Sequence, residues 1–205
     1  MSDIIVQKFG GTSVGSDERI SAVAQIIKNA KKDNQVIVVV SAMSGETNRL
    51  INLAKSFGDN PDRREFDALI STGEKVSASL LAMALNSIGV KAKSFSASQI
   101  SMKTTGHHSK AKIIDVDGEK ILATLNDDIV PIITGFQGVT ESGDVTTLGR
   151  GGSDTTAVAI AAHVNATRCD IYTDVDGIYT TDPVSYTHLR AHETEADLVC
   201  RLLLE

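Results

Sequence analysis

The sequence predicts an α/β protein, a three-layer α/β/α sandwich around a mostly parallel central sheet. Two observations favour this fold class. Short apolar runs rich in β-branched residues, at 4–6, 36–40 and 129–134, alternate with segments of helical periodicity. Two glycine-rich turns, one near each end of the chain, open predicted helices, as expected where ligands bind beyond the carboxyl ends of strands. At 205 residues the chain can hold one such domain with a substantial core.

The composition limits the classes of ligand that the protein can bind and its location in the cell. The net charge is -6 and aromatic residues make up 4% of the chain, which argues against a broad nucleic-acid surface. Cys169 and Cys200 have no metal-ligand spacing, and we expect no metal site built from protein side chains. No apolar run approaches membrane-spanning length, and residues 1–30 lack the regions of a signal peptide. We therefore expect a cytoplasmic protein without nucleic-acid or membrane partners.

The first glycine-rich turn follows directly on the first predicted strand. Lys8 ends this strand, Gly10 and Gly11 are adjacent, and a helix is expected from about Ser16. Glycines let backbone N–H groups approach an anion, and the helix N-terminus and the lysine ammonium add positive charge. Because the lysine precedes the glycines, the motif is neither a P-loop nor a dinucleotide-binding fingerprint. The alternative interpretation is an ordinary strand-to-helix turn with a solvated lysine.

Two further segments carry polar groups toward the same edge of the sheet. Ser41 and Thr47 follow the buried run 36–40, where their hydroxyls could reach a substrate, although Thr47 could instead be a helix N-cap. The helical stretch 61–89 is interrupted at residues 71–75, and Glu74 lies in this interruption. The break favours a carboxylate aimed at a cleft, whereas compensation of the helix dipole is the ordinary alternative.

The second glycine-rich turn, residues 149–152, opens a helix of small apolar residues that we expect to lie buried close to the sheet. It combines a guanidinium suited to a carboxylate or phosphate, on Arg150, with the polar side chains of Ser153 and Asp154. A final strand is predicted at residues 170–174.

The middle of the chain contains two features with structural interpretations. His107 and His108 are adjacent in a polar stretch and would face opposite ways on a strand, so a solvated loop is expected rather than a metal site.

Pro131 lies inside a predicted strand, and because it cannot donate a ladder hydrogen bond we expect an edge or a bulge there.

Taken together, the motifs resemble those of the aspartate kinases, in the amino-acid kinase superfamily. Each motif alone is weak, but the lysine–glycine motif together with the arginine–glycine motif is highly specific. The match extends from about Ile4 to Pro183 and implies an amino-acid kinase fold. The motifs are Lys8-Phe9-Gly10-Gly11-Thr12-Ser13, Val39-Val40-Ser41-Ala42-Met43, Ser71-Thr72-Gly73-Glu74, Gly149-Arg150-Gly151-Gly152-Ser153-Asp154 and Thr173-Asp174-Val175-Asp176-Gly177-Ile178-Tyr179.

The resemblance implies three groups of site residues. Lys8, Gly10 and Gly11 would hold the transferring phosphoryl group, and Asp154 would orient Lys8, so Lys8 and Asp154 are the catalytic candidates. The amino-acid substrate would be held by Ser41, Thr47, Glu74, Arg150, Gly151, Gly152 and Ser153. The nucleoside part of ATP would contact Thr173, Asp174 and Tyr179.

The implied reaction is ATP-dependent phosphorylation of the side-chain carboxylate of L-aspartate to 4-phospho-L-aspartate, the first step towards lysine, threonine and methionine. This carboxylate is already ionised at neutral pH, so no general base is required. Transfer then depends on positioning and charge neutralisation, which Lys8, glycine amides and Mg²⁺ would supply. The implied partners are L-aspartate and MgATP and, in the intact protein, further copies of the chain or a regulatory subunit.

The family pattern also sets the expected domain boundaries. We expect the catalytic domain at residues 1–183, incomplete at its C-terminal end because a basic residue and later nucleotide-site residues normally follow the Asp-Pro pair. We expect residues 184–205 to form a tail unrelated to the family pattern, poorly packed or packed in an unrelated way, and the regulatory ACT-type region to be absent. The alternative for the tail is a docked amphipathic helix that uses Leu198, Val199, Leu202 and Leu203.

Two other functions stay open. Relatives with the same fold phosphorylate glutamate derivatives, carbamate or uridylate, but a nucleotide substrate would not call for Glu74, so an amino acid is favoured. A nucleotide- or amino-acid-binding fragment without turnover is the second alternative, and the missing segment after Pro183 favours it.

Overall fold

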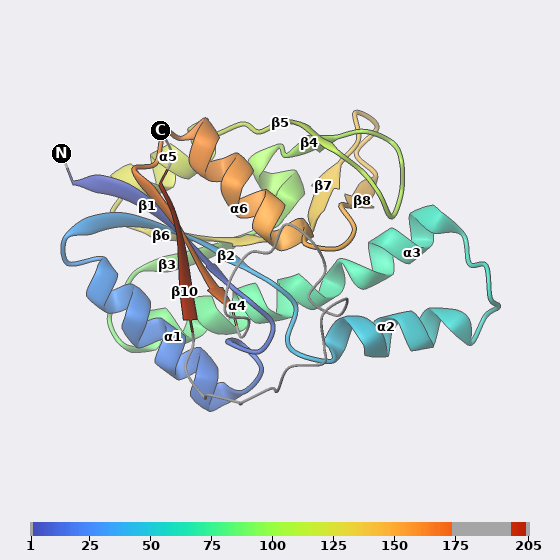
Figure 1. The fold of residues 1–205 in the computed structure, drawn as a ribbon, viewed down its shortest axis with the longest axis horizontal. Coiled ribbons are helices and arrows are strands. Elements are labelled where there is room, and N and C mark those ends of the chain that lie inside the picture. Colours follow the sequence, from blue (N-terminus) through green and yellow to red (C-terminus); the bar gives the residue numbers. More distant parts are fainter. Residues whose placement is uncertain (1, 174–197, 204–205) are drawn as a thin grey trace, which may run out of the picture.

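A six-stranded sheet with the strand order β10-β9-β1-β2-β6-β3 forms the centre of the fold (Figure 1). The structure is a computed structural model that describes residues 2–173 and 198–203. Five strands run parallel, and β10 is antiparallel to β9, which confirms the predicted mostly parallel sheet. The strands are β1 (Asp3–Phe9), β2 (Asn34–Val40), β3 (Ala92–Phe95), β6 (Val130–Thr134), β9 (Arg168–Thr173) and β10 (Leu198–Leu203).

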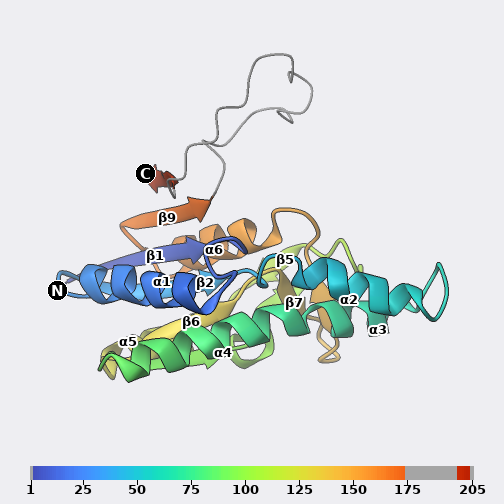
Figure 2. The ribbon, with the colours of Figure 1, turned by 90° about the horizontal axis from the view of Figure 1, so that it is seen from below.

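Helices cover both faces of this sheet, as Figures 1 and 2 show. Val36, Val38 and Val40 of β2 pack on the face covered by α1 and α4, whereas Ile37 and Val39 pack on the face covered by α5 and α6. A strand buried on both faces needs an uninterrupted apolar run, so the run at residues 36–40 made β2 predictable from the sequence. The four helices are α1 (Asp17–Ala30), α4 (Thr72–Ser87), α5 (Glu119–Asn126) and α6 (Gly152–His163).

The start of α1 is confirmed at the predicted position. Ser16 is the N-cap, and its side-chain oxygen accepts the N–H of Arg19 at 3.3 Å. Asp17 and Glu18 occupy the first turn and Lys28 the last, an arrangement of charges that favours the helix dipole. The first glycine-rich turn is therefore anchored between a buried strand and a capped helix.

A second group of elements lies beyond the carboxyl ends of the parallel strands, at the right of Figure 1. It consists of two helices and a small four-stranded sheet with the order β5-β4-β7-β8. Strands of two or three residues are too short to show alternation, so the hydrophobic pattern does not predict this small sheet. The elements are α2 (Glu46–Lys55), α3 (Arg63–Ile70), β4 (Lys103–Thr104), β5 (Ile113–Asp115), β7 (Gln137–Val139), β8 (Val145–Thr147) and the short 3₁₀ helix η1 (Ala97–Ile100).

The interruption between α3 and α4 is shorter than predicted. Ser71 alone separates the two helices, and Glu74 lies in the first turn of α4. The stretch Arg63–Ser87 is long and apolar enough, by length and composition alone, to cross a membrane. Half of its apolar window is buried inside the fold, as in a core helix, so it is only a weak indication of a membrane segment.

The prediction that Pro131 marks an edge strand is wrong, because β6 lies between β2 and β3. Val130 donates its N–H to Lys91 O at 2.9 Å, on the side of β3, which turns the Pro131 nitrogen toward β2. Pairing between β2 and β6 begins one residue later, at Ile132. The ladder on this side therefore starts just after the missing donor, and the sheet tolerates the proline.

The C-terminal segment contains a strand. Leu198 is paired with Thr173 and Leu203 with Arg168, so β10 extends the sheet beyond β9. The amphipathic-helix alternative is therefore wrong for residues 198–203. Residues 174–197 and 204–205 lie outside the described residues, and the expected domain boundary at Pro183 stays a prediction.

Candidate functional site

A cavity of about 630 Å³ opens at the carboxyl ends of β1 and β2, between them and the group formed by α2, α3 and β8. It brings together residues from the first and second glycine-rich turns, the loop after β2 and the start of α4. The sequence-predicted residues that line it are Lys8, Gly11, Ser41, Thr47, Glu74, Arg150, Gly151, Gly152, Ser153 and Asp154. Thr173 ends β9, and Asp174 and Tyr179 lie outside the described residues.

Lys8 is held in place by an ion pair. Its Nζ lies 2.7 Å from Oδ1 of Asp154, in the first turn of α6, and its side chain is only 8% exposed. The alternative of a solvated lysine is therefore wrong. The Asp154 side chain is 44% exposed, so the pair is open to solvent, and to a ligand, on one side. A buried ammonium that is already oriented can interact with a phosphate without reorganisation.

The two adjacent glycines have different roles. The Gly10 N–H donates to Tyr172 O at 3.1 Å, so this amide is used to join the turn to β9. A Cβ on Gly11 would lie 2.7 Å from Ala42 O, closer than real side chains allow, and Gly11 O accepts the N–H of Ser44 at 3.0 Å. The turn therefore packs directly against the loop after β2, and only glycine permits this approach.

Glu74 is a buried carboxylate in the cavity wall, 3% exposed. Its Oε1 accepts the N–H of Ala42 at 3.1 Å, whereas Oε2 has no hydrogen-bond partner among the described residues. Burial raises the pKa of Glu74 to about 7. A buried carboxylate oxygen without a partner is costly, and a cationic ligand group would stabilise it.

The loop after β2 and the turn before α6 complete the wall. The interpretation of Thr47 as an N-cap is wrong: Gly45, with φ at 82°, is the N-cap of α2, and Thr47 lies in the first turn, where it lines the cavity. Arg150 is exposed beside Gly151, whose positive φ of 70° starts α6. The α6 N-terminus therefore opens into the cavity beside a guanidinium, a combination suited to an anion.

The cavity is also lined by residues that were not predicted as site residues, from the loop after β2, α2, α3, the 108–109 loop, the link between β6 and β7, and β8. They include Met43, Asn48, Phe66, Ser109, Phe136 and Thr147. His108 is only 20% exposed and its Nδ1 lies 3.2 Å from Oδ2 of Asp67, so the prediction of a solvated loop is wrong for this histidine. A signal was present in the sequence, because Asp67 falls on the apolar side of a helix, where a carboxylate must find partners.

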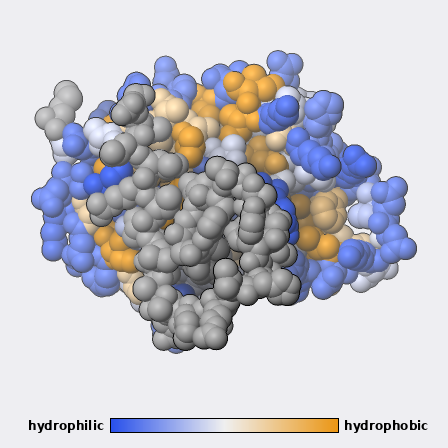
Figure 3. All heavy atoms as spheres, in the orientation of Figure 1, coloured by the Kyte–Doolittle hydropathy of each residue, from blue (hydrophilic) through white to orange (hydrophobic). Residues whose placement is uncertain are grey.

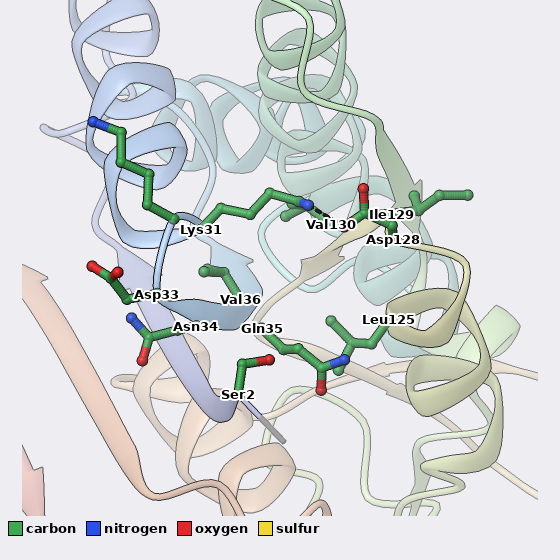
Figure 4. A pocket seen from close by; sticks show the side chains of 11 residues that line it. Ser2, Lys31, Asp33, Asn34, Gln35, Val36, Leu125, Asp128, Ile129 and Val130 are labelled. Atoms are coloured by element: carbon green, nitrogen blue, oxygen red, sulfur yellow. Dashed lines mark hydrogen bonds and ion pairs between the residues drawn. The ribbon is translucent and has the colours of Figure 1, made fainter.

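Two of the other hollows lie beside this cavity and at the opposite end of the sheet. One, of about 760 Å³, lies on the other side of Asp154 and is lined mainly by apolar residues of α6, residues 111–113 and Ile171 of β9. Figure 3 shows hydrophobic side chains at the surface near the position of β5. The other, of about 170 Å³, lies at the amino-terminal ends of the strands, where Lys31 pairs with Asp128 (Figure 4). It contains no sequence-predicted site residue.

Comparison with known proteins places this chain in one family. The model of the amino acid kinase family matches residues 3–196. The chain belongs to the amino acid kinase family, which confirms the predicted resemblance at that level.

Its similarity to particular members is high. An aspartate kinase of Pseudomonas putida is 56% identical over 181 residues, and an aspartokinase of Geobacillus stearothermophilus is 55% identical over 181 residues. Each match covers 88% of this chain and 44% of the relative, so the chain spans less than half the length of these relatives. The structure of E. coli aspartokinase III in complex with aspartate and ADP gives a TM-score of 0.80 at 29% identity, over 91% of this chain and 52% of that chain.

Proposed function

We propose that this chain carries the catalytic site of an aspartate kinase, which transfers the γ-phosphoryl group of ATP to the side-chain carboxylate of L-aspartate. In this step the bond between the γ-phosphorus and the bridging oxygen breaks, a bond to a carboxylate oxygen forms, and ADP leaves. The observation that carries the proposal is a buried carboxylate with an unpartnered oxygen, Glu74, in one cavity with the Lys8–Asp154 pair and Arg150. The names of the similar proteins point to the same substrate.

The cavity offers a partner for each charged group of aspartate. Glu74 would bind the ammonium, which supplies the partner that Oε2 lacks among the described residues. Arg150 would bind the α-carboxylate with two parallel hydrogen bonds, assisted by Ser153 and the α6 N-terminus. The remaining carboxylate would then face Lys8, where the phosphoryl group arrives. Ser41 and Thr47 would add hydroxyl donors from the loop after β2.

The nucleotide would lie on the β9 side of Lys8. The Lys8 ammonium would contact the phosphates, with Gly10 and Gly11 allowing them to approach the backbone. Thr173 ends β9 two residues after Ile171, which borders the apolar hollow beyond Asp154, and we propose that the nucleoside binds there. The resemblance implies that Asp174 and Tyr179, which lie outside the described residues, also contact the nucleoside. The resemblance implies a Mg²⁺ ion, and we propose that it arrives on the nucleotide. When bound, this ion would neutralise phosphate charge.

The resemblance supports the wider parts of the proposal. We propose that the protein is cytoplasmic and that its reaction is the first step in the synthesis of lysine, threonine and methionine. We also propose that the intact protein assembles with further copies of itself or with a regulatory subunit. These rest on similarity to aspartokinases rather than on the cavity.

Aspartate binding should release a proton from Glu74 near neutral pH. Burial raises the pKa of this carboxyl to about 7, and an ammonium placed beside it would favour the ionised form. Affinity should therefore rise up to about tenfold per pH unit below the pKa of Glu74 and level off above it, because the groups of free aspartate do not titrate in this range. Calorimetry at about pH 6 in buffers of different ionisation enthalpy measures the released proton.

Glu74→Gln is the control for this linkage, because glutamine keeps the shape and cannot titrate. The variant should bind aspartate more weakly, with neither the pH dependence nor the proton release. A parent whose aspartate affinity is the same at about pH 6 and pH 8 would contradict the assigned role of Glu74.

The function itself is tested by trapping the acyl phosphate as a hydroxamate while ADP release is measured. Aspartate, glutamate and uridylate are compared in parallel, and we expect product with aspartate only. ADP release with glutamate or uridylate alone would favour a different kinase of the same fold. Binding of aspartate and ATP without ADP release would favour a ligand-binding fragment.

A further inference from the structure

We propose that Asp67 of α3 is a positioning residue, which holds two separate segments of the cavity wall in the geometry that binds the amino acid. The inference rests on the proposed function, because the segments it positions border Arg150. Asp67 itself does not line the cavity. It is 0% exposed, and it acts through Ser109 and Thr147, which do line it.

Four donors and a ring nitrogen of His108 converge on this one carboxylate. Its Oδ2 accepts the N–H groups of Ser109 at 2.8 Å and Thr147 at 2.9 Å, and lies 3.2 Å from Nδ1 of His108. Its Oδ1 accepts the hydroxyls of Thr147 at 2.8 Å and Ser109 at 3.1 Å. The partners are 41, 42 and 80 positions away, so a single side chain joins α3 to a loop and to β8.

Ser109 adopts a backbone conformation that it would rarely hold alone. Its φ is 65°, in the left-handed region that is unfavourable for residues other than glycine. Both its N–H and its hydroxyl are bonded to Asp67, which offsets this strain. Ser109 O in turn lies 3.5 Å from the position that a Cβ on Gly149 would occupy, so the loop packs against the start of the arginine turn.

Thr147 links the same carboxylate to Arg150. It is the last residue of β8, three positions before Arg150, and its N–H and hydroxyl are both bonded to Asp67. The point at which the chain leaves β8 and enters the arginine turn is therefore set by a buried, charged acceptor. A misplacement of about 1 Å at such a point can reduce productive binding markedly.

An asparagine at this position would keep the shape but weaken the hydrogen bonding. A carboxylate offers two charged acceptor oxygens, whereas an amide offers a single uncharged one, and hydrogen bonds to a charged acceptor are roughly twice as strong as bonds to an uncharged one. Asp67→Asn should therefore loosen Ser109 and Thr147 without creating a void.

A second contact between α3 and the β7–β8 hairpin provides a matched control. Arg64 of α3 donates to Oδ1 of Asp144, in the turn between β7 and β8, at 2.6 Å. This pair also joins α3 to the β7–β8 hairpin, but the Arg64 side chain is 55% exposed and neither residue lines the cavity. Asp144→Asn therefore weakens a contact between the same elements by removing its charge, without changing a residue of the cavity wall.

The experiment compares the parent chain, Asp67→Asn and Asp144→Asn. Calorimetry measures the affinities for aspartate and ADP, and hydrogen exchange of the ligand-free proteins measures protection of the Ser109 and Thr147 amides. We expect Asp67→Asn to weaken aspartate binding on the order of tenfold or more, to change ADP binding by less than about twofold, and to lose protection at both amides. Asp144→Asn should match the parent in all three measurements.

Each contrary result overturns a defined part of the inference. Unchanged aspartate affinity in Asp67→Asn, with a parent that binds aspartate, would overturn the positioning role. Equal loss of aspartate and ADP binding, with protection lost across β1 and β2 as well, would show a general structural role. A parent that binds no aspartate would refute the proposed function, and unchanged protection of the two amides would then still overturn the inference. If Asp67→Asn does not fold, Thr147→Val replaces it, with a severalfold loss of aspartate affinity expected.

Discussion

Lys8→Ala should reduce phosphoryl transfer on the order of 10²- to 10³-fold while the fold stays intact. The Lys8 ammonium is buried and oriented by Asp154 at 2.7 Å, so it needs no reorganisation when charge develops on the transferring group. The fold should survive because the Asp154 carboxylate is half-exposed and can be hydrated once its partner is gone. Turnover is measured by hydroxamate formation, and folding by thermal denaturation.

A second ion-paired lysine provides the control for this variant. Lys31 pairs with Asp128 at the opposite end of the sheet, outside the cavity (Figure 4). Lys31→Ala should leave the rate unchanged. Undiminished turnover of Lys8→Ala, in a parent that is itself active, would mean that the Lys8–Asp154 pair only joins β1 to α6.

Arg150→Ala should weaken aspartate binding roughly 10- to 100-fold and leave ATP binding within about twofold. A guanidinium forms two parallel hydrogen bonds with a carboxylate, and Arg150 lies on the turn that packs against Ser109 and lines the cavity with Glu74. Because the side chain is exposed, its removal should hardly change the thermal stability. Arg150→Lys should restore only part of the affinity, since an ammonium cannot reproduce the planar pair.

The control for Arg150 is Arg49, an exposed arginine of α2 that pairs with Glu46 within its own helix. Arg49→Ala should change neither affinity. The opposite pattern for Arg150→Ala, with ATP binding lost and aspartate binding kept, would move Arg150 from the amino-acid side of the site to the nucleotide side.

The large elements could be predicted because their signals are local. The run at 36–40 is buried on both faces, and Ser16 caps α1 through its own first turn, so neighbouring residues determine both outcomes. The two glycine-rich turns were recognisable for a similar reason, since each combines glycines with a single cation. Their meeting in one cavity followed from the parallel sheet, which brings the carboxyl ends of its strands to one edge.

The features that could not be predicted depend on contacts between distant segments. Pro131 is tolerated in a central strand because pairing with β2 begins after it, and no property of the proline itself indicates this register. Asp67 and His108 meet across 41 positions, and the small sheet is built from strands too short to show a period. The N-cap alternative for Thr47 is wrong because Gly45 takes the N-cap position through a left-handed conformation.

The central position of β1 has a consequence for how this chain acquires its structure during synthesis. β1 lies between β2 and β9, and Thr167, just before β9, donates to Ile4 O across 163 positions. β1 therefore leaves the ribosome well before β9, and it keeps one edge unpaired until β9, the last described parallel strand, has been made. Contacts this distant in sequence form slowly, and an open strand edge invites association with other chains. Nascent chains that end before residue 168 should accordingly depend on chaperones and aggregate more readily than longer ones.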